Sequence, residues 1–292
     1  MRVTESMIYN SSNNSLASNL SALQAITEKV GSSKQLNRPS DNPADVRSAI
    51  TLRDTLSQLN QYVRNIDAAT SVVSAADTSM GSAADAIQRA NELAIQGANG
   101  TLDASDSVSM AQEVGQLIEA VAQDAGAKVG DEYIFSGYKV DRAPYQVTGP
   151  GQVGSYQGDE GQMVARVGSD SKLTVNVPGD AVFGPALAAL KQLQDDLNSG
   201  QVVQGSTITQ IQHALDNIMS YRAEVGARAN RLDDAKTSQQ QLITSNDALQ
   251  SQLEDVDMAS AITELTKRQT TYQATLAVTA KVMQTSLLDY LR

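Results

Sequence analysis

The sequence has no cysteine and no tryptophan, and only one histidine and two phenylalanines among 292 residues. Without cysteine the chain can form no disulfide framework, thiolate metal site or iron–sulfur cluster. The single histidine, His213, rules out a histidine metal cluster. So few aromatic residues make an aromatic-lined ligand pocket difficult to build, which argues against a cofactor enzyme.

The chain also lacks basic residues relative to acidic ones, with 22 lysines and arginines against 33 aspartates and glutamates. The resulting net charge of −11 repels phosphate backbones and anionic lipids. No nucleic acid and no membrane is therefore expected as a partner.

Two further absences concern membranes and export. Residues 1–14 are rich in serine, asparagine and threonine, and they lack the apolar core of a cleavable secretory signal. No apolar run approaches the ~18 residues that span a bilayer. We therefore expect a soluble chain, or one that is exported without a cleavable signal peptide.

The middle of the chain differs in composition from its flanks. Residues 101–200 carry a net charge of −8, and the other 192 residues total only −3. The stretch 126–205 holds 13 of the 19 glycines. This composition indicates a separate, acidic domain between flanks whose near-balanced charge suits packing against other chains.

Apolar residues in the flanks recur at spacings of three and four, which is typical of amphipathic helices in coiled coils. They are Leu52, Leu56, Leu59, Val63, Ile66, Val73, Met80 and Ile87 in the first flank, and Ile208, Ile211, Leu215, Ile218, Val225, Leu232, Ile243 and Leu249 in the second. As one helix, residues 206–252 would span roughly 70 Å, which predicts a rod. Shorter stretches of the same pattern predict helices at both chain ends.

Between residues 131 and 183 the pattern changes to short β-prone runs separated by glycine and proline. A further helix is expected from Pro185 to Asn198. The predicted fold is therefore mainly α, a long antiparallel helical rod or coiled-coil bundle built from both chain ends, with a small β-rich insertion. The expected segments are a terminal assembly helix (1–43), rod helices (44–130), a β-rich outward domain (131–183), rod helices (184–252) and a second terminal assembly helix (253–292).

Candidate chemical sites have simpler structural explanations. His213 falls on the surface or seam of a long helix. Residues 149–154 spell the Gly-x-Gly-x-x-Gly dinucleotide fingerprint, but Pro150 interrupts it and no helix follows to hold a phosphate, so a glycine-rich turn is expected. No catalytic, cofactor-binding or metal site is predicted.

Acidic clusters are interpreted in the same way. Side chains of adjacent acids, as in Asp195–Asp196 and Asp233–Asp234, point about 100° apart on a helix and cannot converge on one substrate. The acids of residues 254–257 precede the last helix, where helix capping explains them and cation binding is the alternative. Residues 37–45 form a polar elbow, bounded by prolines, with several potential N-caps for a helix that begins near Ala44.

Three ordered motifs connect these features. Residues 37–44 read NRPSDNPA, residues 225–232 read VGARANRL, and residues 253–259 read LEDVDMA. Together they resemble the elbow, the "GA-x-x-N-R-L" segment and the "I-x-D-x-D-x-A" segment of bacterial flagellins and their hook-associated relatives. The resemblance covers essentially the whole chain and is weakest over residues 95–125 and 180–205.

Within that family, two features resemble the members that join the flagellar hook to the filament. Residues 133–139 (YIFSGYK) and 156–161 (YQGDEG) are similar to the start of their β domain, and residues 286–291 (SLLDYL) are similar to their ending. The resemblance implies a structural adapter between hook and filament, and not an enzyme. The alternative within the family is a short flagellin that forms the filament itself.

The resemblance also implies partners and location. The partners would be further copies of the chain in a ring, the proximal hook-associated protein, flagellin, an export chaperone and the type III export apparatus. The location would be extracellular, at the hook–filament junction. The terminal segments would be disordered until assembly, because short isolated helices cannot bury their apolar stripes alone.

The predicted subunit interface combines the elbow, part of the long C-terminal helix and the apolar faces of the terminal helices. Its residues are Leu16, Leu20, Leu23, Arg38, Pro39, Ser40, Asp41, Asn42, Pro43, Arg228, Asn230, Arg231, Leu276, Met283 and Leu287. Two other classes of protein explain the sequence less well. An enzyme housed in the insertion lacks histidine and suitably spaced acids, and a cytoplasmic signalling coiled coil would explain neither the insertion nor the terminal motifs.

Overall fold

The computed structural model describes the backbone of residues 5–99, 103–149 and 151–290, and all their side chains except those of residues 5, 6, 8 and 282–290. Its helices are α1 (Glu5–Ser32), α2 (Pro43–Ala98), α3 (Ala104–Ala125), α4 (Gly179–Asn198), α5 (Gly205–Glu254) and α6 (Met258–Tyr290). The chain divides into two compact units. The terminal unit comprises residues 1–58 and 243–292, and the central unit comprises residues 59–242.

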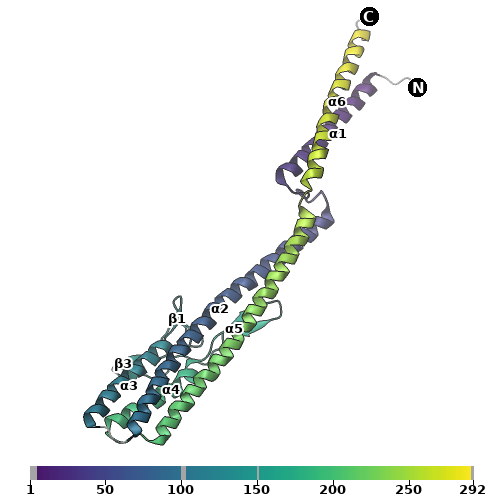
Figure 1. The fold of residues 1–292 in the computed structure, drawn as a ribbon. Coiled ribbons are helices and arrows are strands. Elements are labelled where there is room, and N and C mark those ends of the chain that lie inside the picture. The colour runs from purple at the N-terminus through teal and green to yellow at the C-terminus, as the bar shows by residue number, and fades with distance from the viewer. Residues whose placement is uncertain (1–4, 100–102, 150, 291–292) are drawn as a thin grey trace. The chain divides into compact units, whose positions relative to one another are not determined.

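In the terminal unit, α1 and α6 lie side by side and run in opposite directions (Figure 1). The side chain of Asn19 on α1 donates a hydrogen bond of 2.9 Å to Thr275 on α6. The same unit contains the first turns of α2 and the last turns of α5, where Ala49 and Leu56 are buried.

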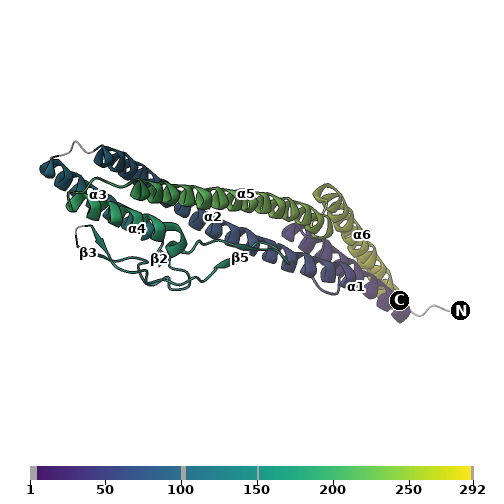
Figure 2. The same cartoon turned by 90° about the horizontal axis from the view of Figure 1, so that it is seen from below.

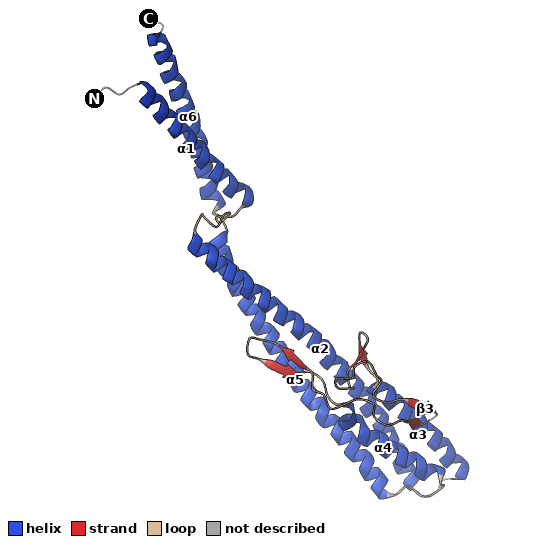
Figure 3. Ribbon diagram, turned by 180° about the vertical axis from the view of Figure 1, so that it is seen from behind, coloured by secondary structure: helices blue, strands red, loops and turns tan. Residues whose placement is uncertain are grey.

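The central unit is a helical bundle in which α3 and α4 pack against each other and against the long helices α2 and α5 (Figure 3). The predicted seam within this unit lines its core, since Ile66 and Met80 on α2 and Ile218 and Leu232 on α5 are fully buried. Leu249, also predicted for the seam, is instead 48% exposed in the terminal unit. Ion pairs join α2 to α5 at the margin of this seam, between Asp77 and Arg222 at 3.1 Å and between Lys236 and Asp67 at 2.8 Å.

Within the described residues the strands form three separate antiparallel pairs, which gather on one side of the helices (Figure 2). They are β1 (Lys128–Val129) with β2 (Glu132–Tyr133), β3 (Val147–Gly149) with β4 (Gln152–Val153), and β5 (Val164–Arg166) with β6 (Lys172–Thr174). Phe135 belongs to no strand. It is fully buried against Phe183 of α4, with the rings edge to face and their centroids 4.8 Å apart. The prediction of a mainly α chain with long helices from both ends and a small β-rich insertion is thus confirmed.

Two side chains of the long helices hold the strand-bearing segment in place. Asn65 of α2 donates a hydrogen bond of 3.0 Å to the carbonyl of Arg166, next to the turn between β5 and β6. Arg228 of α5 donates one of 2.8 Å to the carbonyl of Asn176. The insertion is therefore anchored at the flank of the bundle by side chains that reach backbone carbonyls.

The start of α4 differs from the expectation. The helix begins at Gly179, so Pro185 lies inside it, and its first residues fall within the segment 131–183 assigned to the β-rich domain. Proline has no N–H to donate to the carbonyl four residues earlier, which here belongs to Ala181. Asn217 of α5 donates a hydrogen bond of 2.8 Å to that carbonyl instead. The tertiary contact thus satisfies the acceptor that the proline leaves open.

The excess of acidic residues belongs to the central unit as a whole and is not concentrated in its β-rich insertion. The central unit has 22 acidic and 12 basic residues, a net charge of −10, whereas the terminal unit has 11 and 10, a net charge of −1. Residues 131–183 account for only −3 of this charge. Helix α3 carries four acidic residues and no basic one. The acidic character therefore belongs to the bundle as a whole, and especially to α3.

Gly149 ends β3 and Gly151 precedes β4, so these glycines belong to a strand pair, and no helix follows them to hold a phosphate. Gly151 has φ +67°, and a Cβ there would lie 3.0 Å from the Cα of Gly115 on α3 and overlap the amide of Gln194 on α4. Its N–H donates a hydrogen bond of 3.1 Å to Glu119. The absence of a side chain lets the turn approach the helix backbone.

We predict that Gly151→Ala destabilises the central unit more than Gly130→Ala. Both glycines have positive φ, but a Cβ at Gly130 meets no atom within 4 Å. Gly130→Ala should cost about 1 kcal/mol through backbone strain, and Gly151→Ala about 1–3 kcal/mol more through overpacking. Urea unfolding followed by circular dichroism measures both. Equal losses would show that the turn is not packed against α3 in solution.

Candidate subunit interface

The predicted elbow at residues 37–45 lies at the connection between α1 and α2, residues 33–42. The structure places this connection beside residues 255–257 between α5 and α6, and from here on the elbow means both connections. Asn42 caps α2, because its side-chain oxygen accepts hydrogen bonds from the N–H groups of Ala44 and Asp45 at 3.1 and 3.3 Å. Pro43 occupies the first helical position, where no N–H is needed. The expected helix start is thus confirmed to within one residue.

The other elbow residues of the predicted interface form a tight turn. The backbone N–H groups of Arg38 and Asn37 donate to the Asp41 carboxylate at 2.9 and 3.1 Å, and they lower the pKa of that carboxyl. Arg38 also pairs with Glu28 of α1 at 2.7 Å. Arg38, Pro39, Ser40, Asp41 and Pro43 are all exposed, and Asn42 is half-buried. The turn therefore presents a formed, accessible surface.

A short backbone bridge joins the two connections. The N–H of Gln35 donates to the carbonyl of Glu254 at 2.6 Å, and the N–H of Val256 donates to the carbonyl of Ser33 at 3.2 Å. Lys34 and Asp255 lie opposite each other in this antiparallel bridge, and their side chains form an ion pair of 2.6 Å. This pairing raises the pKa of Lys34 and lowers that of Asp255.

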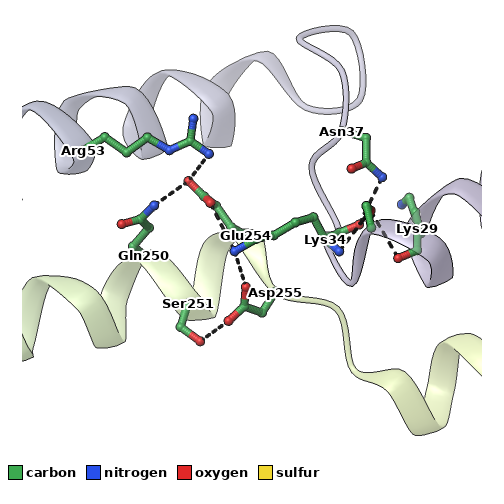
Figure 4. A network of polar contacts seen from close by, with 9 residues as sticks. Lys29, Lys34, Asn37, Arg53, Gln250, Ser251, Glu254 and Asp255 are labelled. Atoms are coloured by element: carbon green, nitrogen blue, oxygen red, sulfur yellow. Dashed lines mark hydrogen bonds and ion pairs between the residues drawn. The ribbon is translucent and has the colours of Figure 1, made fainter.

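Glu254 is the centre of the elbow, and it is only 2% exposed (Figure 4). Its carboxylate lies 2.9 Å from Arg53 of α2 and 3.5 Å from Lys34, and it accepts a hydrogen bond of 3.0 Å from Gln250. Burial acts to raise the pKa of Glu254, but the hydrogen bonds from Arg53 and Gln250 outweigh it, so the pKa lies below its ordinary value. One buried carboxylate thus joins three separate stretches of chain.

The sequence predicts one role, helix capping, for the acids of residues 254–257, and the structure separates their roles. Asp257 caps α6, accepting from the N–H groups of Ala259 and Ser260 at 3.0 and 3.3 Å, as expected. Glu254 is instead the last residue of α5, at the helix end that the macrodipole disfavours for an acid. Capping was therefore the wrong interpretation for Glu254. The sequence places Glu254 between the apolar residues Leu253 and Val256, which hints at burial. Its partners Lys34 and Arg53 are distant in the sequence, and only the fold brings them to it.

The terminal helices expose apolar side chains on a surface with almost no charge. Leu20 is 39% exposed and Leu276 is 42% exposed, whereas Leu16 and Leu23 are half-buried. Residues 6–27 and 269–280 contain no charged side chain. A groove between α1 and α6 is lined mainly by serine and threonine. The predicted side chains of Met283 and Leu287 lie outside the described residues.

The predicted residues on α5 divide into two groups. Arg228 is largely buried and bound within the chain, to Asn176 and, at 2.6 Å, to Glu224. Asn230 and Arg231 are exposed. These residues lie in the central unit, whereas the elbow and the terminal helices belong to the terminal unit. The interface role of all three stays a prediction, and Arg228 also has a structural role in holding the insertion.

The remaining candidate sites show surface character. His213 is exposed, and so are Asp233 and Asp234. Among the described residues, no three acidic or histidine side chains are placed to share a metal ion. Within the same part of the chain, no helix is long and apolar enough to cross a membrane.

We predict that the contribution of Glu254 to stability is lost in acid. Because its pKa is lowered by folding, the stabilisation is present at neutral pH and disappears as the pH falls below about 4.3, the ordinary pKa of glutamate. Glu254→Gln should cost about 2 kcal/mol at neutral pH, and this difference should shrink toward zero near pH 3. Urea unfolding at both pH values measures it. Asp247→Asn, which removes an exposed carboxylate from the same helix, is the control, and a pH-independent cost of Glu254→Gln would contradict the prediction.

Comparison with known proteins places this architecture among flagellar proteins. Flagellar hook-associated protein 3 of Escherichia coli strain K12 is 24% identical over 303 residues, which cover 94% of each chain. Flagellin FlaB2 of Treponema pallidum is 26% identical over 280 residues, which cover 93% of each. A solved structure of a flagellar hook-associated protein from Vibrio parahaemolyticus shares the fold, with a TM-score of 0.67 at 20% identity over 74% of this chain and all of that one.

Two family models match in the order that the motifs predict. The N-terminal helical region of bacterial flagellin matches residues 3–140, and the C-terminal helical region matches residues 208–291. Between them they include the elbow, both terminal helices and most of the two long helices. The chain therefore belongs to the bacterial flagellin family.

Proposed function

We propose that this protein is a structural adapter of the bacterial flagellum, which joins the hook to the filament and catalyses no reaction. On the hook side it would contact the proximal hook-associated protein, and on the other side flagellin. The full-length similarity to flagellar hook-associated protein 3 supports this role.

One observation carries the proposal, namely the uncharged stretches 6–27 of α1 and 269–280 of α6, which expose apolar side chains. Leu20, Leu276 and Val278, the last 62% exposed, gain free energy when another surface covers them, at about 25 cal/mol per Å² before association costs. Copies of this pair can approach closely because residues 6–27 and 269–280 bring no like charges together. We therefore propose a ring of identical subunits held by their terminal units.

The charge of the central unit is compatible with such a ring only if these units stand apart. At −10 each, neighbouring central units repel one another unless they are separated by more than the Debye length, about 8 Å at physiological ionic strength. The terminal units, at −1 each, meet no such barrier. Assembly through the terminal helices follows from this difference.

Export and location complete the proposal. The protein would be carried by an export chaperone to the type III export apparatus and would assemble outside the cell, at the hook–filament junction. Because α1 and α6 already pair within one chain, assembly would cover this pair and would not be needed to form it, unlike the expectation from the sequence.

The second candidate is a flagellin that forms the filament itself, and the similarity to flagellin FlaB2 over 93% of the chain favours it. Immuno-electron microscopy of intact flagella separates the two. Label confined to the boundary between hook and filament supports the adapter. Label along the whole filament would replace the adapter with the flagellin.

We predict that Leu20→Asp and Leu276→Asp abolish incorporation into flagella and leave the monomer folded. Each change places a charge in an uncharged stretch of α1 or α6, at a position that is 39% or 42% exposed, so the folded monomer should lose only about 1 kcal/mol. Motility of a deletion strain that expresses each variant measures assembly, and thermal unfolding checks the monomer. The control is Val202→Asp, at a 55% exposed position of the central unit, which should restore motility. Normal motility with either leucine variant would refute the interface.

A further inference from the structure

The elbow concentrates three kinds of restraint on a few residues. Glu254 ends α5, Arg53 lies on α2, and Lys34 lies on the connection from α1, so three stretches far apart in sequence meet at one carboxylate. The Gln35–Glu254 and Val256–Ser33 hydrogen bonds add a backbone bridge at the same place. Neither connection can change its path without breaking some of these contacts.

Backbone strain marks the same point. Ser33 has φ +56° and is the only non-glycine residue with positive φ in the part of the chain that the structure describes. A left-handed conformation is unfavourable for serine and persists only where the surroundings impose it. Here the carbonyl of Ser33 accepts from Val256, and the side chain of Ser32 accepts from the N–H of Lys34 at 3.2 Å. The bridge therefore holds α1 to its strained ending.

The burial of Glu254 distinguishes this cluster from an ordinary surface ion pair. Its side chain is 3% exposed, whereas those of Arg53 and Lys34 are 60% and 43% exposed. A carboxylate removed from water needs its partners, because losing one leaves a buried charge without compensation. The two cations reach it from the solvent side, so the cluster can open without unpacking the bundle core.

We propose that Glu254, with Lys34 and Arg53, forms a conformational lock that fixes the paths of both elbow connections and so holds the α1–α6 pair in one orientation to the ends of α2 and α5. We call this cluster the Glu254 lock. Resting on the proposed function, a second statement follows: a subunit with an open lock presents its terminal helices in many orientations and joins the ring poorly.

The lock can be tested on the full-length monomer by pulsed electron paramagnetic resonance. Because the chain contains no cysteine, Ser21→Cys and Ser57→Cys give two label sites, on exposed positions of α1 and α2 within the terminal unit. The distance distribution between the labels should be narrow in the parent and in Asp247→Asn, and broad in Glu254→Gln. Equal widths in Glu254→Gln and Asp247→Asn would overturn the lock.

Amide hydrogen exchange gives a second readout at the bridge itself. The N–H groups of Gln35 and Val256 should exchange about tenfold faster in Glu254→Gln than in the parent, whereas amides in the core of the central unit should be unchanged. Lys34→Met, which keeps the pair of Arg53 and Glu254, should give an intermediate increase and serves if Glu254→Gln does not fold. Unchanged exchange at Gln35 and Val256 in both variants would refute the proposal.

Incorporation into flagella tests the second statement separately. Glu254→Gln should reduce motility in a deletion strain, and Asp247→Asn should not. Full motility of a Glu254→Gln protein whose label distances are broad would overturn the link to assembly. Neither measurement on the monomer depends on where the protein resides. Antibody label along the whole filament in immuno-electron microscopy would therefore refute the adapter function and leave the Glu254 lock intact.

Discussion

A buried carboxylate governs the terminal unit because both connections of the elbow pass beside it. Within the terminal unit the chain breaks its helical path twice, between α1 and α2 and between α5 and α6, and these breaks must stay together for α1 and α6 to pair. Apolar contacts alone would fix their separation poorly, since they have no direction. The ion pairs and hydrogen bonds of Glu254 supply the direction, and the antiparallel bridge beside it supplies the register.

The two units of the chain differ in the charge of their surfaces. The central unit buries a continuous apolar core and carries a net charge of −10. The terminal unit balances its charges and leaves long stretches with none, so its surface offers hydroxyl, amide and apolar groups. Such a surface tolerates close neighbours and gains from them. In the proposed ring, association would therefore fall to the terminal unit and repulsion to the central unit.

Local pattern was sufficient for the long helices and insufficient for contacts between them. The three-and-four spacing that includes Ile66, Met80, Ile218 and Leu232 predicted the buried seam, because helical periodicity depends only on residues that are close in sequence. The elbow cap at Asn42 was equally local. The burial of Glu254 depends on residues about 200 positions away, and so does its pairing with Lys34 and Arg53. Sequence spacing cannot predict a contact between residues so far apart in the chain. The hydrogen bond from Arg228 to the carbonyl of Asn176 could not be predicted for the same reason.

The proline inside α4 specifies how that helix aligns with α5. By leaving the carbonyl of Ala181 without its helical donor, Pro185 creates a single acceptor on the helix surface, and the amide of Asn217 fills it. A slide of α4 by one turn would break this hydrogen bond, which therefore favours the observed alignment by about 0.5–1.5 kcal/mol. A residue that usually interrupts a helix thereby contributes to the way α4 aligns with α5.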